Sequence, residues 1–368
     1  MKKIKNRQGK DLKIIHTSDI HLNSRKKERL EALEDILAKA GEKKADLVVI
    51  SGDMFDSNEE ADILRPQLRK MLSSLPYSII AIPGNHDMEA YSSDMNFGDS
   101  IEVYNKLPFD TIDLDGIRII AVPYANQSFN DLAGPLSQGI DKDRLNILLM
   151  HCSLDIPYLG EDEYGDEKRQ AYLPVNSKVL GGIGFDYVFA GHFHSRTVES
   201  RLSEKTMFLY SGSPVSISKK EKGRRTAVLL DTEKPARDRI KLLPLDSFYY
   251  EDINISFIPG KEKEILKKLE KTLSQYKDHK AEICLNIGGS ISTGEKEIAE
   301  NISKLVEKNT TDDTAIDLTQ AYRDISVVLQ DPLYRAFKDK LDESDLEEGL
   351  AKDIEDMVVF QFSRTKAR

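Results

Sequence analysis

The N-terminal part of this 368-residue chain contains a set of short runs rich in carboxylate, imidazole and amide side chains. The runs are Asp19-Ile20-His21, Gly52-Asp53, Gly84-Asn85-His86-Asp87, His151 and Gly191-His192-Phe193-His194. Six of the seven histidines lie in or beside these runs: His16 is just upstream of the first, and only His279 lies elsewhere in the sequence. This distribution indicates that the runs serve one chemical site.

The mixture of side chains in the runs is typical of a transition-metal site. Carboxylate and amide oxygens combined with imidazole nitrogens suit Mn²⁺, Fe²⁺ or Zn²⁺ better than Mg²⁺ or Ca²⁺, which prefer shells made of oxygen. The runs supply no thiolate, so they do not indicate a structural zinc site. Two adjacent ions need a bridging ligand, which a carboxylate can provide through its two oxygens. We therefore expect two divalent ions, which could be Mn²⁺, Fe²⁺ or Zn²⁺, with Asp53 as the bridge.

Each run follows a short apolar segment that predicts a strand. The segments are Lys13–Ile15, Leu47–Ile50, Ser78–Ile82, Ile147–Met150 and Tyr187–Ala190. Their length and β-branched content predict buried strands, which places the candidate ligands on loops at the C-terminal ends of those strands. Open α/β sheets bind what they act on at this edge. Each run taken singly also has a structural explanation, such as a Gly-Asp turn or an alternating edge strand for His-Phe-His.

Other segments predict the elements that complete this region. Residues 25–43 carry apolar side chains at helical spacing, which predicts a helix covering one sheet face. Residues 59–75 show a similar pattern, in which Pro66 predicts a break or a restart. Asp115-Gly116 joins two strand-like segments as a hairpin.

The composition of the chain changes near Leu243-Pro244-Leu245. We predict a first domain at 1–246 that contains all candidate ligands, a small α/β domain at 247–330, and C-terminal helices at 331–368. Two apolar stripes mark those helices: Leu333, Phe337 and Leu341, then Leu346, Leu350, Ile354 and Val358. The stripes predict helices that either pack on their own domain or dock in the groove of a partner.

Five motifs resemble those of the calcineurin-like metallophosphoesterases. They are Ile15-His16-Thr17-Ser18-Asp19-Ile20-His21-Leu22, Ser51-Gly52-Asp53-Met54-Phe55-Asp56, Pro83-Gly84-Asn85-His86-Asp87, Ala190-Gly191-His192-Phe193-His194 and Tyr210-Ser211-Gly212-Ser213-Pro214. Within that family, the first and last motifs are most similar to DNA repair exonucleases of the SbcD type. The resemblance covers residues 11–246. It implies an α/β fold, a four-layer α/β/β/α sandwich, followed here by a small α/β cap and terminal helices.

The resemblance also implies roles for single residues. One ion would be held by Asp19, His21, Asp53 and His194, and the second by Asp53, Asn85, His151 and His192. His86 matches the family's catalytic histidine, which is not a ligand. An imidazole beside the site can protonate the leaving alkoxide of a phosphodiester, and two metal ions can acidify a water and neutralise charge on the phosphate. In the related exonucleases a comparable cap orients the substrate.

Three positions depart from the family's usual pattern. Asn23 stands where many relatives have glycine, and Ile20 where the bacterial exonucleases usually have tryptophan. Asp56 stands where archaeal and eukaryotic nucleases of this branch carry a histidine that handles DNA. None of the three departures removes a candidate ligand.

Net charge bears on how such a protein would bind DNA. The formal net charge is −10, and nonspecific DNA affinity comes from neutralisation of phosphates by Lys and Arg. The acidic balance therefore predicts weak autonomous DNA binding and a partner that supplies part of the grip. The resemblance names that partner as an SbcC-type SMC-like ATPase and also implies a homodimer. The basic run 219–225 is either a solvated turn or a DNA contact.

Several observations indicate the compartment. No apolar run reaches the length of a membrane span, and no hydrophobic segment of a signal peptide follows the Lys-rich N-terminus. Cys152 and Cys284 lie far apart in the sequence, which fits a reducing environment, and we interpret Cys152 as a packed small residue. We expect a soluble cytoplasmic protein with no membrane partner.

The leading interpretation is a DNA exonuclease or endonuclease that uses a two-metal mechanism in DNA repair, together with the ATPase, with Mn²⁺ preferred over Fe²⁺ or Zn²⁺. A phosphodiesterase for small or cyclic nucleotides would use the same core and is the alternative from the same class. A noncatalytic DNA-binding scaffold is the alternative from another class. The complete ligand runs and His86 count against the scaffold.

Overall fold

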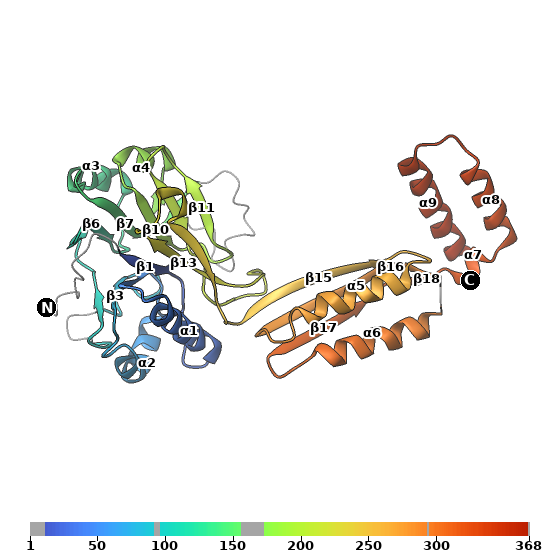
Figure 1. The fold of residues 1–368 in the computed structure, drawn as a ribbon, viewed down its shortest axis with the longest axis horizontal. Coiled ribbons are helices and arrows are strands. Elements are labelled where there is room, and N and C mark those ends of the chain that lie inside the picture. Colours follow the sequence, from blue (N-terminus) through green and yellow to red (C-terminus); the bar gives the residue numbers. More distant parts are fainter. Residues whose placement is uncertain (1–11, 92–95, 156–172, 293, 367–368) are drawn as a thin grey trace. The chain divides into compact units, whose positions relative to one another are not determined.

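The computed structural model describes residues 12–91, 96–155, 173–292 and 294–366 (Figure 1). The chain divides into two compact units, Met1–Tyr250 and Glu251–Arg368. All candidate ligands lie in the first unit. The predicted domain boundaries at 246 and 330 stay predictions.

Two six-stranded sheets form the centre of the first unit. The first sheet has the order β14-β13-β1-β2-β3-β4, with β1 Lys13–Thr17, β2 Leu47–Ser51, β3 Ser78–Ile82, β4 Ile101–Val103, β13 Thr226–Asp231 and β14 Ile240–Pro244. The second has the order β11-β12-β10-β7-β6-β5, with β5 Asp110–Leu114, β6 Ile117–Val122, β7 Leu145–His151, β10 Tyr187–Gly191, β11 Val198–Arg201 and β12 Met207–Tyr210. Short strands β8 Ser153–Leu154 and β9 Pro174–Val175 pair separately.

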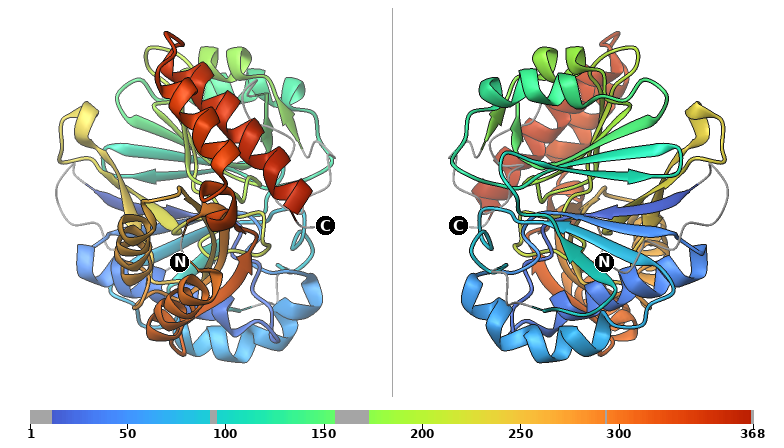
Figure 2. Two further views of the ribbon diagram at one scale, coloured as in Figure 1. Left: turned by 90° about the vertical axis from the view of Figure 1, so that its right-hand side faces the viewer. Right: turned by 90° about the vertical axis from the view of Figure 1, so that its left-hand side faces the viewer.

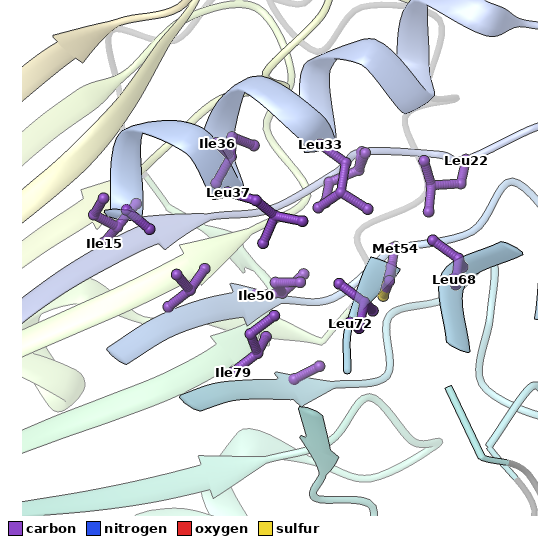
Figure 3. Packing of buried hydrophobic residues seen from close by; sticks show 14 of the residues in the cluster. Ile15, Leu22, Leu33, Ile36, Leu37, Ile50, Met54, Leu68, Leu72 and Ile79 are labelled. Carbon is purple, nitrogen blue, oxygen red and sulfur yellow. The ribbon is translucent and has the colours of Figure 1, made fainter. Parts of the chain in front are cut away.

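Helices cover the outer face of each sheet, as the two views in Figure 2 show. The helices are α1 Lys27–Lys43 and α2 Asn58–Met71 on the first sheet, and α3 Phe129–Gly139 and α4 Ser177–Ile183 on the second. Leu33 and Ile36 of α1 and Leu68 of α2 pack with Ile15 and Ile50 of the first sheet (Figure 3). The predicted helix in residues 25–43 is confirmed.

A separate apolar cluster fills the space between the two sheets. Successive side chains of a strand point to opposite faces, so Ile14 faces the second sheet while Ile15 faces the helices. Val49 and Ile80 of the first sheet meet Leu149 and Phe189 of the second in this cluster. The four layers are therefore α/β/β/α, and the predicted fold is confirmed.

The strands that carry the ligands run parallel to one another within each sheet, although β1 is antiparallel to β13 on its other side. β1, β2 and β3 are parallel in the first sheet, and β6, β7 and β10 are parallel in the second. Gly191 pairs with His151 across β10 and β7, so the run after β10 begins beside the last residue of β7. Parallel strands have their C-terminal ends at one edge, which collects the predicted ligand loops.

Two local predictions had different outcomes. The Asp115-Gly116 hairpin is confirmed, with Gly116 at a φ of 71° between β5 and β6. The break predicted at Pro66 is wrong, because α2 continues through it to Met71. A proline inside a helix costs about 3 kcal/mol, but most helical stability in proteins comes from packing of an apolar face. The buried face that includes Leu64 and Leu68 keeps α2 on the sheet.

The C-terminal part of the chain contains β15 Tyr249–Phe257, α5 Glu262–Ser274, β16 Ala281–Ile291, α6 Glu295–Asn309, β17 Thr314–Gln320, β18 Arg323–Asp324, α7 Ser326–Leu329, α8 Pro332–Asp342 and α9 Glu348–Lys366. Strands and helices alternate from β15, which begins at the end of the first unit, to β17, and the helices α7, α8 and α9 follow the short β18. Ile325, Val328 and Tyr334 form a small core against which Phe337 and Val358 pack. Among the residues that the structure describes, none of the helices combines the length and the apolar character needed to cross a bilayer.

Candidate metal centre

The structure places all seven predicted ligands at the strand ends where they were expected. Asp19 and His21 follow β1, Asp53 follows β2, Asn85 follows β3, His151 ends β7, and His192 and His194 follow β10. Asn85 is half-buried and the other six are buried. The loops of the first sheet are also joined to each other, because the N–H of Asp19 donates to the carbonyl of Gly52 (3.1 Å) and that of His21 to the carbonyl of Asp53 (3.0 Å).

Four of these residues form a first group. One ligand atom from each of Asp19, His21, Asp53 and His194 lies within 4.8 Å of the others. Nε2 of His194 is 3.2 Å from Nε2 of His21 and 3.5 Å from Oδ1 of Asp19. These are the four residues that the family resemblance implied for one ion.

The remaining predicted ligands form a second group that shares Asp53 with the first. Nε2 of His151 lies 2.8 Å from Oδ1 of Asn85 and 3.3 Å from Oδ2 of Asp53. The rings of His151 and His192 have centroids 5.5 Å apart. Oδ2 of Asp53 is also 3.8 Å from Nε2 of His21 in the first group. The Asp53 carboxylate therefore lies between the two groups, where a bridging ligand would have to be.

The backbone at the ligands has an uncommon conformation. Asp19, His21, Asp53 and His192 have φ values of 54°, 48°, 50° and 102°. Positive φ is sterically costly for residues other than glycine, and such strain persists where surrounding structure imposes it, often at functional sites. The tight loops turn these side chains inward toward one another.

Two glycines allow the loops to approach so closely. A Cβ at Gly84 would overlap Oδ1 of Asp53, and a Cβ at Gly52 would overlap the ring of His151. Gly52 also has a φ of 91°, which glycine adopts readily. The carboxylate of Asp87 joins the loops after β2 and β3 by accepting from the N–H of Gly84 (2.8 Å) and that of Phe55 (3.1 Å). The glycines therefore allow the loops both to turn and to pack against the ligand side chains.

Opposite charges are paired inside this buried site. Burial alone would raise the pKa of Asp19, but the hydrogen bond and positive charge of His194 lower it to about 2. Burial also opposes the charged form of Asp53, yet His151 holds its pKa below the usual range. Conversely, burial alone would lower the pKa of His151, but the negative charge of Asp53 raises the pKa to about 9. Both carboxylates therefore stay ionised at neutral pH, as metal ligands must.

The residues present fit divalent metal ions. The buried Oδ2 of Asp53 accepts no hydrogen bond from any residue that the structure describes, which is costly unless a cation interacts with it. Nδ1 of His151 lies 3.0 Å from the carbonyl of Ser51. A carbonyl only accepts, so Nδ1 carries a proton in either charge state of the ring, and Nε2 is the nitrogen that could bind an ion after losing its proton. The donor set combines carboxylate, amide and imidazole, as transition metals prefer.

His86 lies beside the two groups without joining either. Its ring centroid is 4.7 Å from that of His21, at an interplanar angle of 85°. Its backbone N–H donates to Oδ1 of Asp53 (2.9 Å), and its Nδ1 is 3.3 Å from the backbone carbonyl of Asp56. The half-buried ring therefore has one nitrogen held by the protein next to the centre.

Two of the departures from the family pattern contact each other. The Asp56 carboxylate accepts from Nδ2 of Asn23 (2.8 Å) and from Nη1 of Arg29 (2.9 Å), and it lies 3.6 Å from Nδ1 of His21. Burial opposes the charged form of Asp56, but the hydrogen bonds from His21 and Asn23 lower its pKa below the usual range. Asp56 thus holds the outer nitrogen of a predicted ligand.

Sequence reasoning missed Glu221 and Arg225, which lie in the basic run 219–225. Both are buried, and the guanidinium of Arg225 donates to the carbonyls of Ser195 (2.6 Å), Ser213 (2.9 Å) and His194. The charge pattern of the run indicated a solvated turn or a DNA contact. No local signal distinguishes the two inward-facing residues, because their partners are distant in sequence.

The fold and the site define a class that the sequence comparison also identifies. Residues 12–196, half of the chain, match the calcineurin-like phosphoesterase family, and the chain belongs to that family. The class is therefore that of metal-dependent hydrolases of phosphoester bonds.

Among individual proteins, the chain is similar to the SbcD component of the nuclease SbcCD from Staphylococcus epidermidis. The two are 27% identical over 216 residues, which cover 50% of this chain and 57% of the relative, so the match spans little more than half of the relative's length.

Two solved structures were also compared with the chain. One is a dimetal phosphatase from Danio rerio, with a TM-score of 0.44 and 11% identity, covering 64% of this chain and 96% of that chain. The other is GAP50, the anchor in the inner membrane complex of Plasmodium, with a TM-score of 0.39 and 12% identity, covering 64% and 89%. The family assignment depends on the sequence match.

Proposed function

We propose that this chain is a DNA nuclease that hydrolyses phosphodiester bonds with two divalent ions, Mn²⁺ being the preferred metal. The observation that carries the proposal is the pair of buried ligand groups that share Asp53, with His86 beside them. Similarity to one component of the nuclease SbcCD favours DNA as the substrate.

The predicted ligands and His86 would have different roles. Asp19, His21, Asp53 and His194 would hold one ion, and Asp53, Asn85, His151 and His192 the other. When bound, the two ions acidify a water for attack and neutralise charge on the phosphate. The side chains themselves are buried, so that cations and a phosphate group would meet in a region of low dielectric constant.

His86 is the proposed general acid. Its Nδ1 lies next to the carbonyl of Asp56, which can only accept, so Nδ1 carries a proton in either charge state of the ring. The proton given to the leaving alkoxide therefore comes from Nε2 of the imidazolium. A hydrogen bond from the backbone of His86 to Asp53 holds the ring at the edge of the centre.

A nuclease with a net negative charge is expected to bind DNA weakly by itself. The formal net charge of −10 supports the proposal that an SbcC-type ATPase supplies part of the DNA affinity, in a DNA repair complex in the cytoplasm. On α9, Leu350 is 51% exposed, whereas Val358 packs in the small core of α7 to α9. We assign the exposed part of the stripe, Leu346 and Leu350, to the ATPase. We also propose that the chain forms a homodimer. The small α/β domain predicted at 247–330 would orient the substrate.

One assay separates the candidate functions. The purified chain with Mn²⁺ is offered a labelled DNA duplex, labelled single strands and a small phosphodiester in parallel, with a chelator control. Metal-dependent cleavage of DNA supports the nuclease, and product lengths distinguish exonuclease from endonuclease activity. Hydrolysis of the small diester alone, also in the presence of the ATPase, supports a small-nucleotide phosphodiesterase instead. DNA binding without hydrolysis of any substrate supports a scaffold.

A further inference from the structure

His194 is held from both sides of its ring. Nε2 faces the centre, 3.2 Å from Nε2 of His21 and 3.5 Å from Oδ1 of Asp19. Nδ1 faces away from the centre and lies 3.6 Å from Oε1 of Glu221. The imidazole thus connects the first ligand group to a carboxylate that none of the predicted motifs contains.

Glu221 is itself fixed in place. The residue is fully buried, and its Oε2 accepts from the N–H of Ile217 (2.8 Å). The hydroxyl of Ser218 lies 3.5 Å from Oε1, and the N–H of Glu221 donates to the carbonyl of Ser218 (3.1 Å). The hydroxyl of Ser216 donates to the carbonyl of Glu221. A buried carboxylate is costly to desolvate, so it needs hydrogen-bond donors or opposite charge nearby.

Arg225 supports the same arrangement, through its charge near the carboxylate and through hydrogen bonds to the backbone. Each of its guanidinium nitrogens donates to a backbone carbonyl, and two of these carbonyls belong to His194 and Ser195. The run that contains both charges is therefore anchored to the loop after β10. The guanidinium hydrogens of Arg225 go to carbonyls, and Oε1 of Glu221 lies 3.6 Å from Nδ1 of His194.

We propose that Glu221 is a positioning residue for His194: its carboxylate accepts the Nδ1 proton and thereby directs the Nε2 lone pair at the ion held with Asp19, His21 and Asp53. The inference rests on the ligand role proposed for His194. A ligand histidine commonly donates its outer N–H to a carboxylate, which selects one tautomer, fixes the ring and makes the inner nitrogen more basic. Loss of such a partner typically weakens metal affinity 10–100-fold.

The test measures metal binding rather than turnover. Glu221→Gln keeps the size of the side chain but not its charge, and the metal-free protein is titrated with Mn²⁺ by calorimetry. We expect affinity for one ion to fall about 10–100-fold while affinity for the other changes little. Glu204→Gln, on an exposed glutamate of the same unit, is the matched control and should bind Mn²⁺ as the unmodified protein does. Unchanged affinity in Glu221→Gln overturns the proposal.

A second measurement needs no folded variant of Glu221. In the unmodified protein loaded with diamagnetic Zn²⁺, ¹⁵N NMR of the histidine rings reports which nitrogen carries the proton, with the His194 signals assigned by their loss in His194→Gln. A protonated Nδ1 and a metal-coordinated Nε2 support the proposal, and the reverse overturns it. Neither measurement uses DNA, so a protein that binds metal in this way but cleaves no DNA would refute the proposed function and leave the role of Glu221 intact.

Discussion

At the scale of single residues, Asp53 contacts both groups of ligands. We predict that Asp53→Asn lowers hydrolysis of every phosphodiester to background, because the amide cannot provide the negative charge that two cations share. Asn has nearly the same volume, so the fold should be retained. Circular dichroism, Mn²⁺ stoichiometry and a small-diester assay check the three parts. A variant that keeps two ions and most of its activity would show that Asp53 is not the bridge.

His86 allows chemistry to be separated from metal binding. We predict that His86→Ala lowers turnover by roughly 10²–10⁴-fold, the usual contribution of a general acid or base, while both ions stay bound. An aryl phosphodiester with a good leaving group should lose less activity, since that group leaves without a proton. The measurement is turnover on both substrates at saturating Mn²⁺. Equal losses on the two substrates would contradict the general-acid role.

The buried His151 predicts a pH dependence of the metal-free protein. Its pKa is raised to about 9 by Asp53, above the value of about 6.5 in an unfolded chain. The folded state therefore binds the extra proton, and this stabilisation is fully present below about pH 6.5 and lost as the pH rises through about 9. We expect the Tm measured with a chelator to fall across this window.

Mn²⁺ should reverse that pH dependence, because the ion replaces the proton at Nε2 and binds more tightly as the proton leaves. His151→Gln, which does not titrate, is the control and should reduce the slope of the chelated profile between about pH 6.5 and 9. The remaining slope would come from His194, whose pKa is raised, despite its burial, by Asp19. A chelated Tm that rises over this range in the unmodified protein would show that the imidazole is not stabilised as a cation.

At the scale of elements, the loops after β2 and β3 must pass each other closely. We predict that Gly84→Ala displaces the Asp53 carboxylate, weakens Mn²⁺ binding and destabilises the fold by about 1–3 kcal/mol, as overpacking of a tight site does. Gly134→Ala in α3 is the matched control, because a Cβ there meets no atom within 4 Å. That control should be neutral or stabilising by up to about 1 kcal/mol. Calorimetry and thermal unfolding check both variants, and normal Mn²⁺ affinity in Gly84→Ala would contradict the predicted displacement.

At the scale of the whole molecule, some apolar residues of the C-terminal segment are exposed and others pack in its small core. Truncation at 330 would expose Ile325 and Val328, so point variants separate docking from packing more cleanly. We predict that replacing the exposed Leu346 and Leu350 by serine weakens binding to the ATPase without lowering the Tm. Val358→Ala should instead lower stability by about 1 kcal/mol, because its side chain packs against the small core.

Pull-down with an SbcC-type ATPase and thermal unfolding measure these two effects. Small-diester hydrolysis should be unchanged in both variants, since neither change touches the metal centre. If the double variant at Leu346 and Leu350 binds the ATPase as tightly as the unmodified chain, docking on this stripe is refuted. If its Tm falls strongly, the two leucines contribute to packing instead.

Local sequence patterns were enough to predict five strands of the two central sheets and the side chains at their ends. A β-branched apolar run followed by a polar ligand run is a local pattern, so the strands β1, β2, β3, β7 and β10 and the loops carrying Asp19 to His194 could be predicted. The order of layers followed from the family resemblance. Helix α1 could also be predicted, because its apolar spacing lies within one segment.

Only the tertiary structure decided what these side chains contact. Pro66 stays inside a helix because a packed face outweighs its local cost. The Asp56 carboxylate contacts Asn23, Arg29 and His21. Glu221 and Arg225 look like part of a solvated basic run until β10 and β13 bring the run to His194. Each of these outcomes depends on burial and on contacts between residues distant in the chain. A local pattern encodes neither, since the free energy of a charged or polar side chain is set by the groups that surround it after folding.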